Sequence, residues 1–347
     1  MVIVGRTNLT EFAYSGLGIN PHYGTPRNAW DRGAARLPGG SSSGAAISVT
    51  DAMAQAAIGT DTGGSVRIPA ALNGLCGFKP TARRVPLTGT LPLSISADSA
   101  GPIARTVADC ALLDAVLAGE PVGLPDALSL RGLRLAVPTT VVQDELAPAV
   151  ARAFAAACAR LSAAGATLAE TPFPLFARAA EVNPRGAISG AEAWWFHRHM
   201  IAAHADQYDP RVLARIRPGE AIGAADYIEM LQQRRHFIAD VEAACAGFDG
   251  LLMPVTPDTA PTIAEVSARD EDYFRWNSRM LRNPSLVNLY DGCALALPCH
   301  PPGAAPVGLM IAGTAGADRR ILAIGLAAER VLREPGAEAA GMEKSRL

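Results

Sequence analysis

Two glycine- and serine-rich segments carry the groups best suited to chemistry. The first is Pro38-Gly39-Gly40-Ser41-Ser42-Ser43-Gly44, and the second is Gly59-Thr60-Asp61-Thr62-Gly63-Gly64-Ser65-Val66-Arg67-Ile68-Pro69-Ala70-Ala71. A serine hydroxyl becomes a nucleophile when a neighbouring group takes its proton. Glycines before a serine allow a sharp turn and leave consecutive N–H groups that can cradle an oxyanion. Ser65, at the end of the second turn, is therefore a candidate nucleophile.

Two charged residues flank this second turn. Pairing of Asp61 with Arg67 would fix the shape of the turn rather than add much stability. If a helix begins at Ser65, its N-terminus adds positive potential there. Neither the GxxxxGK[ST] pattern of phosphate-binding loops nor a GxSxG elbow is present. An ordinary turn and a helix-capping run of serines are the structural alternatives.

Strand and helix patterns alternate along the chain. The apolar spacing predicts helical structure over residues 44–57, which would join the two loops and bring them together in space. Further strands are predicted over residues 1–4, 133–137, 251–255 and 307–312, and further helices over residues 105–118, 144–164, 225–245 and 318–333. This alternation favours an α/β fold in one domain.

Several motifs, in this order, resemble the amidase signature family. They are PGGSSSG, GTDTGGSVRIPAA, GLCGFKPT at 74–81 and GPIARTVADCALLDAVLAG at 101–119, flanked by VIVGRTNLTEFAYSG and SLVNLYDGCALALPCHPPGAAPVGLMIAG. The resemblance implies an α/β fold with a mixed central β-sheet flanked by helices on both faces. It implies one domain over 1–335, with its core signature at 37–119, a variable substrate-pocket region at about 170–280, and a tail at 336–347.

The resemblance also implies a mechanism, in which a Ser–cis-Ser–Lys triad hydrolyses an amide to an acid and ammonia or an amine. It places the nucleophile that forms the acyl-enzyme at Ser65 and the bridging serine, with a cis peptide bond, at Ser41. Ser42, Asp61 and Arg67 would support this site. The backbone amides of Thr62, Gly63 and Gly64, with that of Ser65, would form the oxyanion hole.

The lysine of this triad is the part that the resemblance does not supply. In the family it lies upstream of the VIVGRTN segment, with which this chain opens. The two lysines present are Lys79, matched in the family without being the base, and Lys344 in the tail. We therefore expect a chain truncated at its N-terminus relative to the family, without the catalytic lysine, without the N-terminal portion of the fold and with impaired activity.

Other functions remain open on the sequence alone. One is a non-catalytic pseudoenzyme that binds amides, or an amidotransferase A-like subunit. Another is a Ser–His hydrolase that uses His197 or His300. The cluster Trp194-Trp195-Phe196 could line an acyl pocket or simply pack within the protein.

The composition excludes several classes of protein. Apolar residues make up 49% of the chain and charged residues 18%, which is typical of a globular domain. A net charge of −2 without a basic cluster argues against a nucleic-acid partner. The six cysteines form no CxxC pair, as expected of free thiols in a cytoplasmic protein without a membrane partner. The implied partner is a small-molecule amide, a homodimer is one open oligomeric state, and no metal or organic cofactor is implied.

Overall fold

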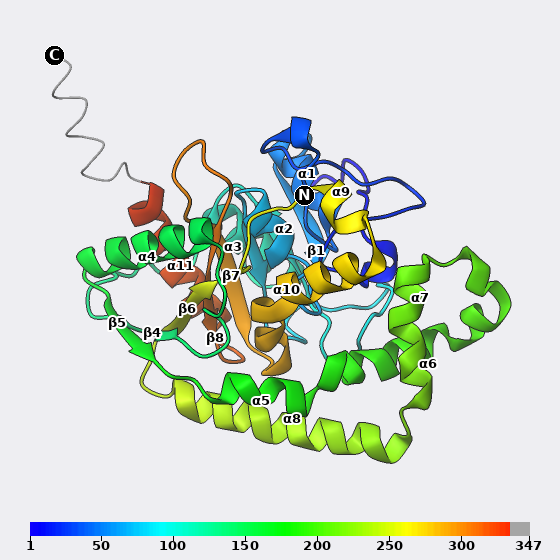
Figure 1. Cartoon of the computed structure of the whole chain (residues 1–347). Coiled ribbons are helices and arrows are strands. Elements are labelled where there is room, and N and C mark those ends of the chain that lie inside the picture. Colours follow the sequence, from blue (N-terminus) through cyan, green and yellow to red (C-terminus); the bar gives the residue numbers. More distant parts are fainter. Residues whose placement is uncertain (334–347) are drawn as a thin grey trace.

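A mixed sheet forms the centre of the computed structural model, which describes residues 1–333 (Figure 1). Its strand order is β1-β3-β2-β7-β8-β6-β4-β5 within the described part of the chain. The strands are β1 (Ala56–Thr60), β2 (Cys76–Lys79), β3 (Ala100–Ala104), β4 (Arg134–Pro138), β5 (Thr167–Thr171), β6 (Gly250–Pro254), β7 (Cys293–Pro298) and β8 (Gly308–Gly313). The pairs β4–β5 and β4–β6 are parallel, and the other pairs are antiparallel.

Helices cover both faces of this sheet (Figure 1). One face carries α3 (Val107–Ala118), α4 (Pro148–Ala163) and α11 (Asp318–Arg333). The other carries α1 (Ser43–Thr50), α2 (Arg67–Leu72), α5 (Leu175–Val182), α8 (Ala224–Cys245) and α10 (Asp270–Leu289). Beyond this face lie α6 (Ala187–His204), α7 (Pro210–Ile216) and α9 (Ile263–Ser267). The predicted α/β class, with helices on both faces of a mixed sheet, is confirmed.

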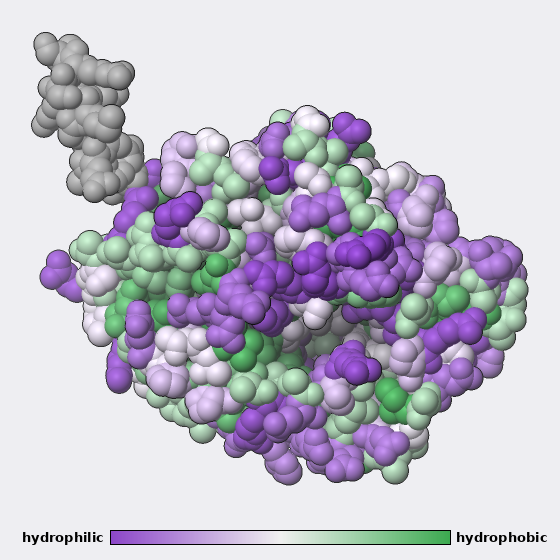
Figure 2. All heavy atoms as spheres, in the orientation of Figure 1, coloured by the Kyte–Doolittle hydropathy of each residue, from purple (hydrophilic) through white to green (hydrophobic). Residues whose placement is uncertain are grey.

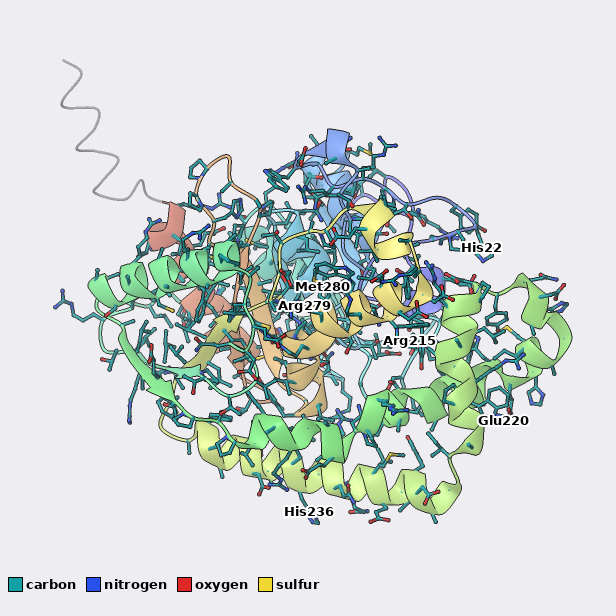
Figure 3. The ribbon with its side chains drawn as sticks, viewed as in Figure 1. His22, Arg215, Glu220, His236, Arg279 and Met280 are labelled. Carbon is teal, nitrogen blue, oxygen red and sulfur yellow. The ribbon has the colours of Figure 1, made fainter. Side chains whose placement is uncertain are left out.

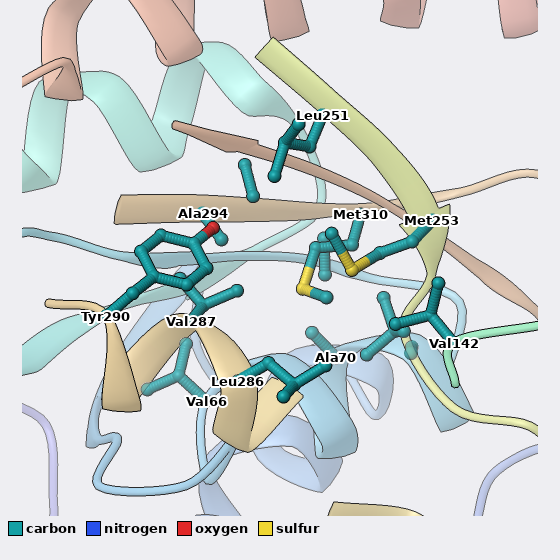
Figure 4. Close-up of a cluster of buried hydrophobic side chains, with 14 of the residues drawn as sticks. Val66, Ala70, Val142, Leu251, Met253, Leu286, Val287, Tyr290, Ala294 and Met310 are labelled. Carbon is teal, nitrogen blue, oxygen red and sulfur yellow. The ribbon is translucent and has the colours of Figure 1, made fainter. Parts of the chain in front are cut away.

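Alternation along the central strand β7 supplies both layers of the core. Leu295 and Leu297 point into the layer under α3, α4 and α11, whereas Ala294 and Ala296 join the layer under α2 and α10. Successive side chains of a strand point to opposite faces, so a fully apolar strand buries both of its sides. Figure 4 shows the second layer, in which Met310 of β8 lies close to residues from α2 and α10.

Two glycines let α2 lie unusually close to the sheet. A Cβ atom on Gly308 would lie 2.6 Å from the Cβ atom of Ala71, and one on Gly77 would lie 2.7 Å from that of Ala70. Real Cβ atoms do not approach this closely, so a larger residue at either position would push the helix away. The short distance holds the turn that precedes α2 directly against the sheet.

Two local predictions from the sequence are wrong. Residues 1–4 form no strand and have exposed side chains, from 75% for Val4 to 86% for Val2, because no neighbouring strand pairs with this β-branched run. The helix expected over 44–57 is shorter and is limited to α1, because Ala56 and Ala57 belong to β1 and pair with β3.

The predicted tail at 336–347 lies outside the described residues. None of the helices in residues 1–333 has the length and apolar character to cross a bilayer.

Candidate active site

The two glycine- and serine-rich loops meet, as the sequence predicts. The chain leaves the first loop through α1, returns along β1 and enters the second loop at Asp61. The Ser42 N–H donates to the Ser65 carbonyl oxygen over 3.2 Å, and the Ser42 hydroxyl donates to the Thr60 carbonyl oxygen over 3.4 Å. The peptide bond between Gly40 and Ser41 is cis. Ser41 and Ser65 are therefore brought close together by one short helix and one strand.

A buried ion pair organises the second loop. Arg67 Nε donates to Asp61 Oδ2 over 3.0 Å, and Arg67 Nη2 donates to Asp61 Oδ1 over 2.9 Å. Both side chains are fully buried. Burial alone would raise the pKa of Asp61, but the Arg67 charge and its hydrogen bonds outweigh this effect and hold that pKa at about 2. Asp61 is thus an anion, and its carboxylate oxygens accept the hydrogen bonds that define the turn.

Helix α10 closes the loop from the other side. Asn288 Nδ2 donates to Asp61 Oδ1 over 3.0 Å, and Asn288 Oδ1 accepts from Arg67 Nη2 over 2.6 Å. A Cβ atom on Gly64, whose φ is +128°, would lie 2.7 Å from Pro284. Glycine at position 64 is therefore required both by the backbone conformation and by the close approach of α10. Asn288 could not be assigned to this site from the sequence, because no local motif links it to a loop more than 200 residues earlier.

The backbone donors of the turn differ from the predicted set. The Gly64 N–H donates to Asp61 Oδ1 over 2.8 Å, so in this geometry Gly64 is not available to an oxyanion. The Thr62, Gly63 and Ser65 N–H groups have no acceptor among the described residues. The Thr62 hydroxyl instead donates to Asp98 over 2.5 Å. Three backbone donors therefore remain beside the Ser65 hydroxyl.

A cavity of about 700 Å³ opens on this turn, and Figure 2 shows the molecule hollowed beside the hydrophilic band that follows α10. Thr62, Gly63 and Ser65 line it, and the Ser65 residue is only 4% exposed. The opposite walls come from α5, α6, α7, α8 and α10. This size suits a small organic substrate rather than a macromolecule. Ser65 therefore lines the cavity beside N–H groups that have no acceptor among the described residues.

The histidines considered as bases lie elsewhere. His197 is fully buried, and its Nδ1 lies 2.9 Å from the Tyr208 hydroxyl. His300 contacts the backbone of Val307. Neither histidine lines the cavity, and neither does the Trp194-Trp195-Phe196 cluster, in which Trp195 is 53% exposed. The cavity geometry does not support the Ser–His hydrolase or the aromatic acyl pocket.

Lys79 is buried at the end of β2, where its Nζ donates to the carbonyl oxygens of Pro80 and Gly292 over 2.7 and 2.6 Å. Burial and the nearby Arg67 lower the pKa of Lys79 to about 8, although Asp61 opposes the shift. This lysine is engaged with two backbone carbonyls and has no hydrogen bond to Ser41 or Ser65 among the described residues.

The lowered pKa of Lys79 predicts a pH-dependent stability. Between about pH 8 and the ordinary lysine pKa of 10.5, the unfolded chain keeps a proton that the folded chain has lost. The folded state therefore gains stability as the pH rises through this window. Urea unfolding at pH 7 and pH 10 should show the wild type gaining about 2 kcal/mol relative to Lys79→Met. An equal pH dependence in the two proteins would contradict the assignment.

Comparison with known proteins identifies relatives over nearly the whole chain. A family model described as Amidase matches residues 1–322. The 2-amino-5-chloromuconic acid deaminase of Comamonas testosteroni is 37% identical over 95% of this chain and 72% of that protein. The A subunit of the glutamyl-tRNA(Gln) amidotransferase of Acidothermus cellulolyticus is 34% identical over 96% of this chain and 73% of that protein.

A solved structure gives the same result for the fold. A crystal structure described as an amidase superposes with a TM-score of 0.83 at 34% identity, covering 94% of this chain and 74% of that one. These comparisons do not bear out the expected N-terminal truncation. The impaired activity that was expected from the truncation is likewise not shown.

Proposed function

This chain belongs to the amidase family of hydrolases acting on carbon–nitrogen bonds, and from that premise we propose that it hydrolyses a carboxylic amide through an acyl-enzyme on Ser65. The observation that carries the proposal is the position of Ser65, on the wall of the cavity and beside the unpaired N–H groups of Thr62 and Gly63. Nucleophile and oxyanion donors are thus adjacent at the place where a substrate carbonyl can lie.

The proposed reaction has two stages. The Ser65 oxygen attacks the amide carbon, and its proton passes to Ser41, which gives its own hydroxyl proton to the leaving nitrogen. The carbon–nitrogen bond breaks, ammonia or an amine leaves, and Ser65 carries an ester. Water then attacks the ester, and its proton returns to Ser65 through Ser41 as the acid is released. The relay is neutral overall, and Lys79 has no part in it.

The supporting residues hold the turn rather than touch the substrate. Asp61 accepts from the N–H groups of Gly64 and Val66, and Arg67 fixes the Asp61 carboxylate. Ser42 ties the first loop to the second. The N–H groups of Thr62, Gly63 and Ser65 would donate to the oxyanion. These hydrogen bonds would shorten as negative charge develops on the substrate oxygen.

The test is a search for both the product and the intermediate. The purified chain should release ammonia from simple primary amides, and rapid acid quenching followed by mass spectrometry should find the acyl group on the peptide that contains Ser65. The deaminase relative supports ammonia as the leaving group. Hydrolysis without any acyl adduct, or with the adduct on another residue, would contradict the assignment of Ser65.

A second candidate is an amidotransferase A-like subunit. The relative from Acidothermus cellulolyticus carries the name of such a component. Under this alternative the chain would co-purify with a larger partner from its source cells and hydrolyse free amides poorly without it. A monomer or homodimer with full hydrolytic activity favours the first proposal.

The free state of all six cysteines supports a cytoplasmic location under either proposed function.

A further inference from the structure

The cavity at Ser65 has a strongly one-sided charge. Arg185, Arg215, Arg234 and Arg282 line it, and no Asp or Glu is present among the described residues of its wall. None of these four arginines forms an ion pair within the described residues. Arg234 is buried, Arg215 and Arg282 are half-buried, and Arg185 is exposed. Charges withdrawn from water are normally paired, because burial without a counter-ion is costly. The cavity wall is therefore built for an anionic group.

Arg215 combines a guanidinium that is held in place with a free donor edge. Its guanidinium carbon lies 4.7 Å from the centre of the Tyr14 ring, and its Nη1 donates to the Tyr14 carbonyl oxygen. Its Nε and Nη2 have no acceptor among the described residues. Figure 3 places Arg215 between α7 and α10, towards the middle of the molecule. Stacking on Tyr14 fixes the guanidinium plane, while the Nε–Nη2 edge suits bidentate binding of a carboxylate.

Arg234 reinforces this charge from α8. It is 8% exposed, and it donates to the carbonyl oxygens of Leu289, Ser96 and Asn288 over 2.9, 2.9 and 3.0 Å. Neutral carbonyls hold its position without cancelling its charge. Of the carboxylates in its neighbourhood, Glu192 accepts from the hydroxyls of Ser94 and Tyr227, and Asp291 pairs with Arg83.

We propose that the cavity binds substrates whose amide is accompanied by a carboxylate, with Arg215 as the direct partner of that carboxylate and Arg234 adding attraction. The proposal rests on the function proposed above, since it places this amide carbonyl at Ser65. Selectivity follows from the same charges. An uncharged amide of equal size leaves the Arg215 edge unpaired in a desolvated site, so it loses charge-assisted hydrogen bonds.

The test compares acidic amides with neutral isosteres. Succinamate and glutaramate are measured against butyramide and valeramide by ammonia release at fixed ionic strength. We expect kcat/KM for the acidic member of each pair to be about 10- to 100-fold higher. Arg215→Met should reduce this ratio about tenfold or more, and Arg215→Lys should restore part of it. The matched control is Arg235→Met, because Arg235 is exposed on the same helix as Arg234 and should leave the ratio unchanged.

Two results would overturn the proposal. One is a wild-type protein whose kcat/KM is nearly the same for the acidic and the neutral amide of each pair. The other is an Arg215→Met variant that loses the same factor in kcat/KM for both amides, which indicates a structural role. Failure of all four amides to react would count against the proposed function instead. In that case calorimetry with the unreacted glutaramate and valeramide still tests the arginines: glutaramate should bind the wild type and bind Arg215→Met at least about tenfold more weakly, and equal binding of glutaramate and the uncharged valeramide to the wild type would refute the carboxylate site.

Discussion

Ser65→Ala is expected to lower kcat for amide hydrolysis by at least about 10³-fold, the largest effect that we predict for a single change in this chain. The variant removes the atom that would form the acyl-enzyme but keeps the backbone donors and the cavity. Its folding should be unchanged, because the Ser65 hydroxyl has no hydrogen bond to another described residue and the side chain loses a single oxygen. Ammonia release and urea unfolding, measured on the same preparation, check both statements.

A matched control separates loss of the nucleophile from loss of a cavity hydroxyl. Ser285 lines the same cavity from α10, and its hydroxyl donates only within its own helix, to the Arg282 carbonyl oxygen. Ser285→Ala should keep the rate within the same order of magnitude. Ser41→Ala should resemble Ser65→Ala, and the double variant should be little slower than either single variant, since groups that act as a unit are not additive. Substantial hydrolysis by Ser65→Ala would remove it as the nucleophile.

The parts of the site that lie within one short segment could be predicted from the sequence. The glycine-rich turn, the Asp61–Arg67 pair and the return of the chain through a helix and a strand all depend on residues 38–71. Local turn geometry and the short connection leave few other arrangements. The fold class followed from the alternation of strand and helix patterns, since the predicted segments that became β4, β6, β8, α3, α4, α8 and α11 already alternate along the chain.

The parts contributed by distant residues could not be predicted. Asn288, Arg215 and Arg234 reach the site from helices whose positions depend on packing against the whole sheet face. Arginines are also frequent in this chain, so one more on a helix gives no signal by itself. The engagement of the Gly64 N–H by Asp61 is a detail of a single hydrogen bond, which residue types alone do not determine.

Removal of either member of the Asp61–Arg67 pair is expected to have the largest effect on stability. Asp61→Ala leaves the Arg67 charge buried with Asn288 and the Met310 sulfur as its remaining partners, and it strips the acceptors from the N–H groups of Gly64 and Val66. We expect the free energy of unfolding to fall by about 3–5 kcal/mol, the range for breaking a buried pair. Urea unfolding curves measure this directly.

An exposed pair in the same protein provides the control. Arg178 and Asp240 lie 3.0 Å apart with side chains that are 49% and 47% exposed. Arg178→Met should change the free energy of unfolding by no more than about 1 kcal/mol, because water screens an exposed pair and the side chains lose freedom in forming it. If the two substitutions had equal effects, the Asp61–Arg67 pair could not be treated as a buried charge network.

The double variant Asp61→Leu/Arg67→Met shows whether the pair serves stability or the site. Replacing both charges with apolar side chains leaves neither one buried alone, so this variant should be more stable than either single variant. Its hydrolytic activity should nevertheless stay at least about 10²-fold below the wild type, because no carboxylate remains to hold the turn before Ser65 and the oxyanion donors lose their alignment. A double variant that regained both stability and activity would show that packing alone shapes the turn, and Asp61 and Arg67 would then have no positioning role.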